Sequence, residues 1–450
     1  MKRYIDTQRS FFNTHATKDI SFRLNELRRL EKVLKDNLPS LNKAIYTDFK
    51  KSALETHLTE LGILFKDITE AKHKLGRWSR KQKVATNLPN FPASSYIIPE
   101  PLGVCLVIGT WNYPYLLSLG PVVGVIAAGN TAIIKPSEIA SETSKLLAKL
   151  VNENFDPSFL KVIEGGVPET TALLEQKFDK IFFTGSTKVG KIVYQAAAKH
   201  MTPVTLELGG KSPAFITADC NLKMTAKRLI WSKFLNAGQT CIAPDYVMID
   251  KQIEAEFLEY AQREIEQARY HFDNENYVQI ISDQHFERLE KLLDSGDVVY
   301  GGEKDRADRY IQPTLLKNVT FKDKVMQEEI FGPILPVISY TSLDAAIAQV
   351  RELPKPLSCY IFTSSKKKKR KLRKELSFGG GAMNDAVMHF SNPNLPFGGV
   401  GYSGIGSYHG EAGFKTFSHY KSILDKPTWF ELPIKFSPYS TWKKNILKYM

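Results

Sequence analysis

The N-terminal part of the chain carries apolar positions at the spacing of a helix. Charged residues fill most of the other positions, so the pattern predicts helices that lie on a core with one apolar face. The chain then passes through 87–101, which holds four prolines and is expected to form an extended arm or hairpin. Two apolar stripes recur at intervals of three and four residues: Leu27, Leu30, Leu34, Leu38, Leu41 and Ile45, then Leu54, Leu58, Leu61, Phe65 and Ile68.

Short β-branched runs alternate with helical stretches from Gly103 onward. This alternation predicts βαβ units and a parallel sheet, which places the chain in the α/β fold class. A second α/β region runs from about 206 to 378, and the aromatic, lysine-rich segment from Phe414 onward is expected to be a tail on the surface or against a neighbour. Strands are expected at 103–108, 131–134, 160–163 and 180–183, and helices at 122–128, 142–154 and 189–199.

Length and composition indicate a globular protein of two or three domains. The chain has 450 residues, of which 43% are hydrophobic and 24% charged, and this balance excludes an intrinsically disordered chain. The net charge of +13 permits attraction to anionic lipid or nucleic acid without establishing it. The basic cluster at 366–371 (KKKKRK) is more simply explained as a solvated helix start or loop, so no nucleic acid partner is predicted.

The four cysteines contain no CxxC pair, so neither a disulfide framework nor a metal site is expected. Cys241 differs from the others because it follows small and polar residues (NAGQT) and is the candidate nucleophile, although this setting taken alone favours a structural thiol. Cys105 and Cys359 lie in strand-forming runs and are expected to be inert, and Cys220 is given no role. No secretory signal or membrane span is visible, which predicts a cytoplasmic protein.

Two polar side chains at expected strand ends suit acyl chemistry. Glu207 lies among apolar neighbours before two glycines (VTLELGG), where burial would raise its pKa to that of a general base acting near neutral pH. The alternative is a carboxylate that caps or salt-bridges a strand end. Asn112 lies in the segment TWNYP, where its amide can donate to a developing oxyanion or can simply form a turn.

Two other strand ends offer groups for a nucleotide. The turn at 185–190 (GSTKVG) opens a helix whose backbone N–H groups could face a phosphate, but it lacks the middle glycine of GxGxxG and the hydroxyl residue of a P-loop. An ordinary tight turn is therefore the alternative. Lys135 and Glu138 follow the strand at 131–134, where open α/β sheets bind dinucleotides. The alternative there is a helix N-terminus capped by Ser137.

Together these segments resemble the aldehyde dehydrogenase superfamily over nearly the whole chain. Each segment is a weak signal, but their shared order is specific. Glu207 and Cys241 stand 241 − 207 = 34 positions apart, which fits that family. The matching segments are 206–211 (LELGGK), 239–241 (QTC), 183–190 (FTGSTKVG), 328–333 (EEIFGP), 396–401 (PFGGVG) and 408–410 (YHG).

The short N-terminus resembles the class 3 branch, with its fatty and aromatic aldehyde dehydrogenases, and the bacterial relatives that oxidise polyene aldehydes in carotenoid biosynthesis. The resemblance implies the aldehyde dehydrogenase fold, with a Rossmann-like NAD-binding domain (1–86 and 102–206), an α/β catalytic domain (207–386), and a small β oligomerisation arm and tail (87–101 and 387–450). Fatty-aldehyde members can carry a C-terminal hydrophobic anchor. This chain instead ends with Lys443, Lys444 and Lys448, which fits peripheral contact with a membrane surface better than permanent anchoring.

The resemblance also implies the reaction, an NAD(P)-dependent oxidation of an aldehyde to a carboxylic acid. Cys241 would form a thiohemiacetal and then a thioester, Asn112 and the Cys241 backbone N–H would hold the oxyanion, and Glu207 would activate water. NAD is favoured over NADP because Glu138 would repel a 2′-phosphate. The implied cofactor-binding residues are Trp111, Lys135, Glu138, Gly185, Ser186, Gly190, Glu329 and Phe331.

Class 3 relatives are commonly dimers, so a homodimer is expected. Two alternatives remain: an acylating or reducing relative that passes the acyl group to coenzyme A, which Glu207 argues against, and a non-catalytic basic binding protein on the same fold. The implied mechanism needs no histidine, so His389 and His409 are expected to be structural.

Overall fold

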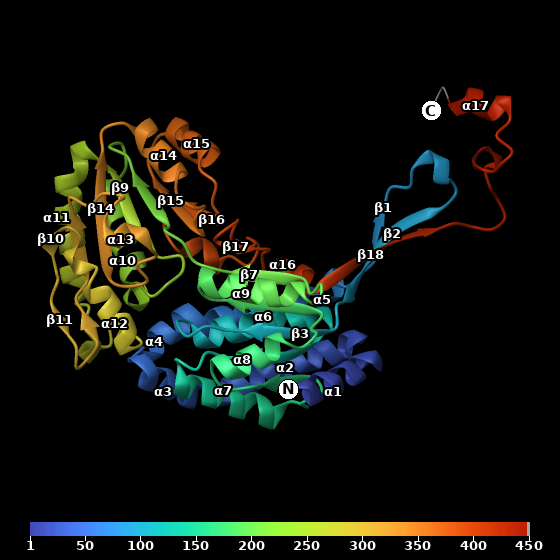
Figure 1. The fold of residues 1–450 in the computed structure, drawn as a ribbon, viewed down its shortest axis with the longest axis horizontal. Helices are drawn as coiled ribbons and strands as arrows, with labels where there is room; N and C mark the ends of the chain where they lie inside the picture. Colours follow the sequence, from blue (N-terminus) through green and yellow to red (C-terminus); the bar gives the residue numbers. More distant parts are fainter. Residues whose placement is uncertain (448–450) are drawn as a thin grey trace.

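The computed structural model describes residues 1–447 and contains two large sheets and a projecting arm (Figure 1). The first sheet has the strand order β17-β7-β6-β3-β4-β5, in which only β17 is antiparallel to its neighbour. This topology confirms the predicted α/β class. The strands are β3 (Val104–Ile108), β4 (Thr131–Lys135), β5 (Leu160–Val162), β6 (Lys180–Thr184), β7 (Val204–Glu207) and β17 (Gly404–Ile405).

Helices cover both faces of the first sheet. In β3, Leu106 packs with α1, α8 and α9 on one face, whereas Cys105 and Val107 pack with the helices on the other face. A strand buried on both faces is apolar throughout, which explains the continuous apolar run at 104–108. The helices are α1 (Lys2–Asn13), α2 (Ile20–Asp36), α3 (Leu38–Phe49), α6 (Pro114–Ala128), α7 (Ser141–Asn154), α8 (Val167–Leu174) and α9 (Thr187–Ala198).

The second apolar stripe forms an interrupted helix. A π-helical turn at His57–Leu61 joins α4 (Ala53–Thr56) to α5 (Gly62–Trp78). Because a π turn holds more residues than an α turn, it rotates the residues before it, and its own first residues, away from the face that α5 buries. Leu54 and Leu58 are 70% and 63% exposed, so the expectation that they join the core was wrong.

The second sheet has the strand order β10-β13-β14-β9-β8-β15-β16, parallel except for β10. Its strands are β8 (Pro213–Ile216), β9 (Tyr246–Asp250), β10 (Asp297–Tyr300), β13 (Thr314–Lys317), β14 (Ile334–Tyr340), β15 (Ser358–Phe362) and β16 (Gly380–Met383). Its helices are α10 (Leu222–Phe234), α11 (Glu254–Ala268), α12 (Asp283–Glu290), α13 (Lys324–Gln327), α14 (Leu343–Arg351) and α15 (Lys366–Glu375).

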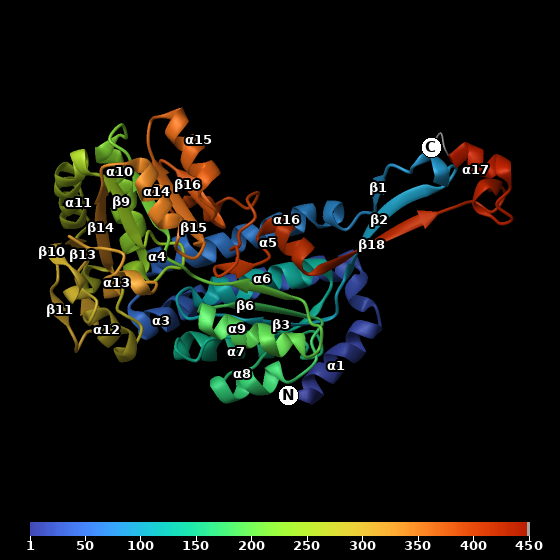
Figure 2. The same cartoon turned by 45° about the horizontal axis from the view of Figure 1, so that its top comes forward.

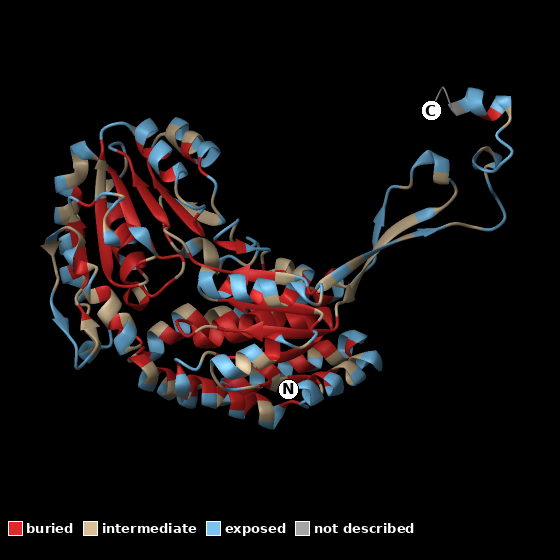
Figure 3. Ribbon diagram, viewed as in Figure 1, coloured by how far each residue is buried: buried red, intermediate tan, exposed pale blue. Residues whose placement is uncertain are grey.

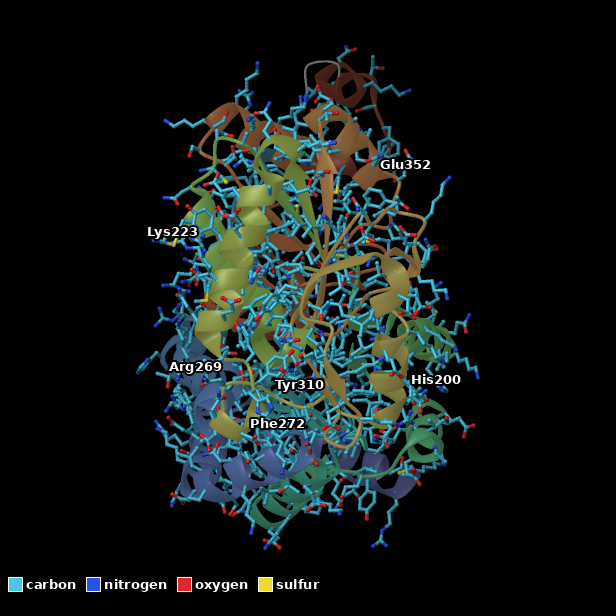
Figure 4. All side chains as sticks on the ribbon, turned by 90° about the vertical axis from the view of Figure 1, so that its left-hand side faces the viewer. His200, Lys223, Arg269, Phe272, Tyr310 and Glu352 are labelled. Atoms are coloured by element: carbon cyan, nitrogen blue, oxygen red, sulfur yellow. The ribbon has the colours of Figure 1, made fainter. Side chains whose placement is uncertain are left out.

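The face of this second part that Figure 4 shows carries the connection between α11 and α12. Phe272 in that connection lies beside Tyr310, with ring centroids 6.1 Å apart. Tyr310 belongs to a small ladder of β11 (Lys304–Asp305) and β12 (Tyr310–Ile311). The connection is therefore held against the body by aromatic packing, and other residues of it border a cavity described below.

The arm is a three-stranded antiparallel sheet that extends from the body (Figures 1 and 2). It joins β1 (Gln82–Val84) and β2 (Ser94–Pro101) to β18 (Ser418–Asp425), and it confirms the extended hairpin predicted from the prolines. Figure 3 shows that the residues of the arm are exposed or half-buried, unlike the two buried sheets. The chain reaches β18 through α16 (Gly410–Thr416) and ends in α17 (Thr441–Leu447) near the arm's tip. Within residues 1–447, no helix is both long and apolar enough to cross a membrane.

Candidate active site

Three neighbouring parallel strands of the first sheet, β3, β6 and β7, end at one edge and border a cavity of about 620 Å³. The carboxyl ends of parallel strands share an edge, and ligands of open α/β sheets bind there. We call this space the polar cavity. Of the predicted site residues, it is lined by Trp111, Asn112, Gly185, Ser186, Glu207, Cys241, Glu329 and Phe331.

A second cavity, of about 430 Å³, meets the first at Cys241. Most of its lining is aliphatic or aromatic, including Leu116, Phe234 and Phe397, and we call it the apolar cavity. Leu117 and Cys241 border both cavities. The thiol therefore lies where a polar site and an apolar site adjoin, and it can be reached from either.

The loop before Cys241 is held in an unusual conformation. Asn236 and Ala237 adopt φ values of 54° and 52°, and at Gly238 a Cβ atom would lie 2.3 Å from the carbonyl oxygen of Gly332. The buried Gln239 side chain fixes the loop: its amide donates to the Gln279 carbonyl at 3.1 Å and accepts from the backbone N–H of Ile281 at 3.0 Å. These contacts explain the small and polar residues seen before this cysteine.

Burial sets the protonation of both candidate reacting groups. It raises the pKa of the Cys241 thiol, and the carboxyl groups of Glu329 and Glu207 raise it further. It also raises the pKa of Glu207 well above its ordinary value. Glu207 is 2% exposed, and neither of its carboxyl oxygens has a hydrogen-bond partner within the described chain. A carboxylate with a raised pKa is a stronger base, which is what proton abstraction from water or a buried thiol requires.

Asn112 places its amide between β3 and the cysteine loop. The side chain is 1% exposed, and Nδ2 donates to the Gln239 carbonyl at 3.0 Å. An amide group has two N–H donors, so the second can serve an oxyanion. The backbone carbonyl of Asn112 in turn accepts from Asn236 Nδ2 at 3.0 Å.

The carboxyl of Glu329 lies at the polar cavity in a space that is open because residue 209 is a glycine. A Cβ atom at Gly209 would lie 1.9 Å from Glu329 Oε2. Burial raises the pKa of Glu329 to about 8, and its Oε1 is buried without a partner among residues 1–447. Phe331 adopts a φ of 49°, and its ring meets that of Trp111 edge-on, with centroids 5.3 Å apart.

Three predicted cofactor residues do not border the polar cavity. Lys135 lies buried at the end of β4, where its ammonium donates to the Pro136 carbonyl at 2.6 Å and lies 3.6 Å from the Glu138 carboxylate. At Gly190 a Cβ atom would lie 2.6 Å from Leu208, so this glycine permits close packing of α9 on the strand end. A cofactor contact of any of the three stays a prediction.

The sequence matches the family described as the Aldehyde dehydrogenase family over residues 1–423. This chain belongs to the aldehyde dehydrogenase family. It is 46% identical to the 4,4'-diaponeurosporen-aldehyde dehydrogenase of Staphylococcus aureus, over 97% of this chain and 96% of the relative. It is 42% identical to aldehyde dehydrogenase family 3 member H1 of Arabidopsis thaliana, over 98% and 92%. The substrate-bound structure of Staphylococcus aureus AldH superposes with a TM-score of 0.97 at 44% identity, over 100% and 99% of the two chains.

These likenesses confirm the predicted superfamily, its class 3 character and the aldehyde dehydrogenase fold. This aldehyde dehydrogenase is therefore an oxidoreductase that acts on aldehydes. The family match over most of the chain and the relatives named as aldehyde dehydrogenases argue against the alternative of a non-catalytic binding protein.

Sequence reasoning missed two residues of this aldehyde dehydrogenase that border the polar cavity, His285 and Arg288 on α12. Arg288 donates to the backbone carbonyls of Glu329 and Ile330 at 3.4 and 2.5 Å, which fixes the segment that carries Glu329. His285 and Arg288 are three positions apart on α12, and no sequence motif surrounds them. Their place at the site therefore depends on the tertiary fold. His389 and His409 border neither cavity, and their predicted structural role stays a prediction.

Proposed function

We propose that this aldehyde dehydrogenase oxidises a long, apolar aldehyde, with a polyene (carotenoid) aldehyde as the leading candidate, to its carboxylic acid with NAD. The observation that carries the proposal is the position of Cys241, which borders both the apolar cavity and the polar cavity. An apolar chain gains free energy on entering an apolar cavity, and this would bring its aldehyde carbon to the thiol. The name of the Staphylococcus aureus relative supports the same substrate class.

Cys241 is the proposed nucleophile and Asn112 the proposed oxyanion donor. The thiolate adds to the aldehyde carbon, and the resulting oxyanion accepts hydrogen bonds from the free N–H of the Asn112 amide and from the Cys241 backbone. One such donor contributes roughly 10²–10³ in rate. The thiol needs a base because its pKa is raised, and either Glu207, at the same cavity, or a water between the two side chains takes its proton.

Glu207 also completes the reaction after the Cys241 adduct has been oxidised to a thioester. Its carboxylate takes a proton from water, and the hydroxide formed displaces the sulfur and releases the acid. This assignment favours hydrolysis over the alternative in which coenzyme A accepts the acyl group, since acyl transfer to a thiol needs no activated water. Acid formed in equal amount to reduced cofactor, without coenzyme A, would support the assignment.

The polar cavity fits a nicotinamide dinucleotide. Ser186 caps α9 by accepting from the Val189 N–H at 3.3 Å, and the first residues of that helix line the cavity, which supports the assignment of the helix N-terminus to the cofactor's phosphates. The buried, unpartnered Oε1 of Glu329 offers an acceptor for a ribose hydroxyl. When bound, the dinucleotide accepts the two electrons of the oxidation. Glu138 favours NAD over NADP, because its carboxylate repels a 2′-phosphate.

The arm supports a homodimer. A three-stranded sheet gains independent stability only when its apolar face is covered, and this sheet projects into solvent. The arm and its turn expose apolar side chains, among them Val84, Leu88, Phe91 and Leu424. A second copy of the chain would cover them.

We also keep the predicted domain boundaries. The cofactor-binding domain comprises 1–86 with 102–206, the catalytic domain 207–386, and the arm and tail 87–101 with 387–450.

The tail supports peripheral contact with a membrane surface of a protein that otherwise acts in the cytoplasm. Trp429, Tyr439 and Trp442 are 76%, 62% and 49% exposed, and basic residues such as Lys444 lie among them. Aromatic rings with lysines bind at the interface of anionic bilayers. Lys448, which belongs to the same predicted group, lies outside the described residues.

A substrate panel tests the proposal. Short aliphatic, aromatic, long-chain and polyene aldehydes are compared by kcat/KM, each with NAD and with NADP. The proposal predicts that long-chain and polyene aldehydes exceed propanal by at least about tenfold, as burial of several methylene groups implies, and that NAD exceeds NADP. A preference for propanal would contradict it.

A further inference from the structure

The apolar cavity contains acidic side chains but no basic ones. Among the described residues that line it, the only charged side chains are Glu55 and Glu275. Glu275 lies at the exposed surface, whereas Glu55 is partly buried beside Ser52 and Thr59. An apolar aldehyde needs no charged group there, so none of the bond-making steps proposed above uses the carboxyl of Glu55.

Glu55 is held in place from both ends. Its backbone N–H donates to the Ser52 hydroxyl at 3.2 Å at the start of α4. Its carboxyl Oε1 accepts from the backbone N–H of Asn236 at 2.9 Å. Within residues 1–447 the second carboxyl oxygen has no hydrogen-bond partner, and it is not among the fully enclosed unpartnered atoms, so it reaches the cavity surface.

The nearby cation is already paired with another carboxylate. Lys51 Nζ lies 3.0 Å from Glu60 Oε1, and both side chains are fully buried. Glu60 Oε2 also accepts from the backbone N–H groups of Tyr115 and Leu116 at 2.8 and 3.2 Å. Glu60 is therefore the carboxylate that balances Lys51, and ionisation of Glu55 leaves this cluster with a net charge of −1.

We propose that Glu55 is a specificity-determining residue that excludes aldehydes bearing an anionic group from the apolar cavity. This inference rests on the proposed function of that cavity. A second anion near Glu55 meets like-charge repulsion in a poorly solvated space, and no lysine or arginine of the described lining offsets the loss of its hydration. Burial, and to a lesser extent the Glu60 carboxylate, raise the pKa of Glu55 by more than Lys51 and the Asn236 N–H lower it, so the repulsion strengthens as the pH rises and Glu55 ionises.

The same arrangement assists release of the product. The carboxylic acid formed at Cys241 ionises at neutral pH. The Glu55 carboxylate, which does not hinder entry of a neutral aldehyde, then repels this anionic product. Glu55 thus separates substrate from product by charge.

The test compares benzaldehyde with 4-carboxybenzaldehyde, which differ by one carboxylate. In the wild-type enzyme, kcat/KM for the anionic aldehyde should be lower by at least about tenfold, as expected for a poorly screened like charge. Glu55→Gln keeps an acceptor for the Asn236 N–H. It should reduce the ratio of the two kcat/KM values, benzaldehyde over 4-carboxybenzaldehyde, by about tenfold. Glu275→Gln removes the same charge from the exposed rim, where water screens it, and should change the ratio by less than about twofold.

A purely structural role for Glu55 predicts that both aldehydes lose rate together and that their ratio stays constant, and that result would overturn the inference. Leu58→Lys gives an independent variant, because this exposed side chain of the lining can change without disturbing the core. Its ammonium should also narrow the ratio, and an unchanged ratio would count against the inference. If the wild-type enzyme oxidised neither aldehyde nor any long-chain aldehyde, the proposed function itself would fail, and this inference with it.

Discussion

The side-chain amide of Asn112 donates a 3.0 Å hydrogen bond to the carbonyl of Gln239, two residues before Cys241. This bond joins the segment that follows β3 to the loop that carries the thiol, and the Asn236 side-chain amide adds a second link by donating to the backbone carbonyl of Asn112. The amide cannot rotate freely, so its second N–H has a fixed position relative to the sulfur. A donor that is already oriented costs no reorganisation when an oxyanion forms.

Replacing Asn112 with alanine should therefore lower kcat by roughly 10²–10³. KM should change less, because the donor acts on the charge that develops during the reaction. Steady-state kinetics with a long-chain aldehyde measures both constants, and Asn87→Ala on the arm serves as the control. If kcat fell by less than about fivefold, Asn112 would not be the donor at the proposed oxyanion site.

Glu207→Gln should slow release of the acid more than formation of the thioester. The amide cannot deprotonate water, so we expect kcat to fall by roughly 10²–10⁴. Stopped-flow measurement of reduced cofactor should then show a burst of about one equivalent per thiol, followed by slow turnover. Loss of the burst as well would mean that Glu207 is needed mainly to activate Cys241.

His389 should make the fold sensitive to moderately acidic pH. Burial lowers its pKa to about 4 from an ordinary value of 6.5. Between these values the unfolded chain binds a proton that the folded chain does not, so stability falls as pH drops from about 6.5 to about 4. The loss should reach about 2–3 kcal/mol. Urea unfolding at several pH values measures it, and His389→Gln should flatten this part of the profile. If the free energy of unfolding of His389→Gln fell with pH as steeply as that of the wild type, His389 would not be the source of this pH dependence.

Lys51→Met should destabilise the fold by about 3–5 kcal/mol, because it leaves the buried Glu60 carboxylate without its ammonium. The exposed pair Lys32–Asp36 provides the control, and Lys32→Met should cost less than about 1 kcal/mol. The comparison uses the free energy of unfolding from urea titration. Equal losses in the two variants would show that the buried pair contributes nothing beyond a surface pair.

The sequence predicted the features that depend on local patterning. The apolar run at 104–108 became β3, and the prolines of 87–101 marked the arm. It failed where the backbone departs from regular geometry. Leu54 and Leu58 fit a helical stripe, but the π turn at His57–Leu61 moves them to the cavity rim. Spacing rules assume one helical period, so they cannot detect such a turn.

The candidate site was predictable only in part, for a different reason. Cys241, Glu207 and Asn112 stand in short distinctive segments, and the fold brings them to one cavity. Glu55 and Arg288 carry no local signal, because their setting depends on partners far along the chain, at Asn236 and Glu329. Which cavity a charged residue borders is a property of tertiary packing, and no single-sequence pattern encodes it.

The central claim is that the substrate becomes covalently bound to Cys241. Mass spectrometry of the Glu207→Gln enzyme, quenched during turnover with a long-chain aldehyde and NAD and then digested, tests it most directly. The account predicts an acyl group on the peptide that contains Cys241, and unmodified peptides for Cys105, Cys220 and Cys359. Continued aldehyde oxidation with no adduct on Cys241, or with the adduct on another cysteine, would contradict it.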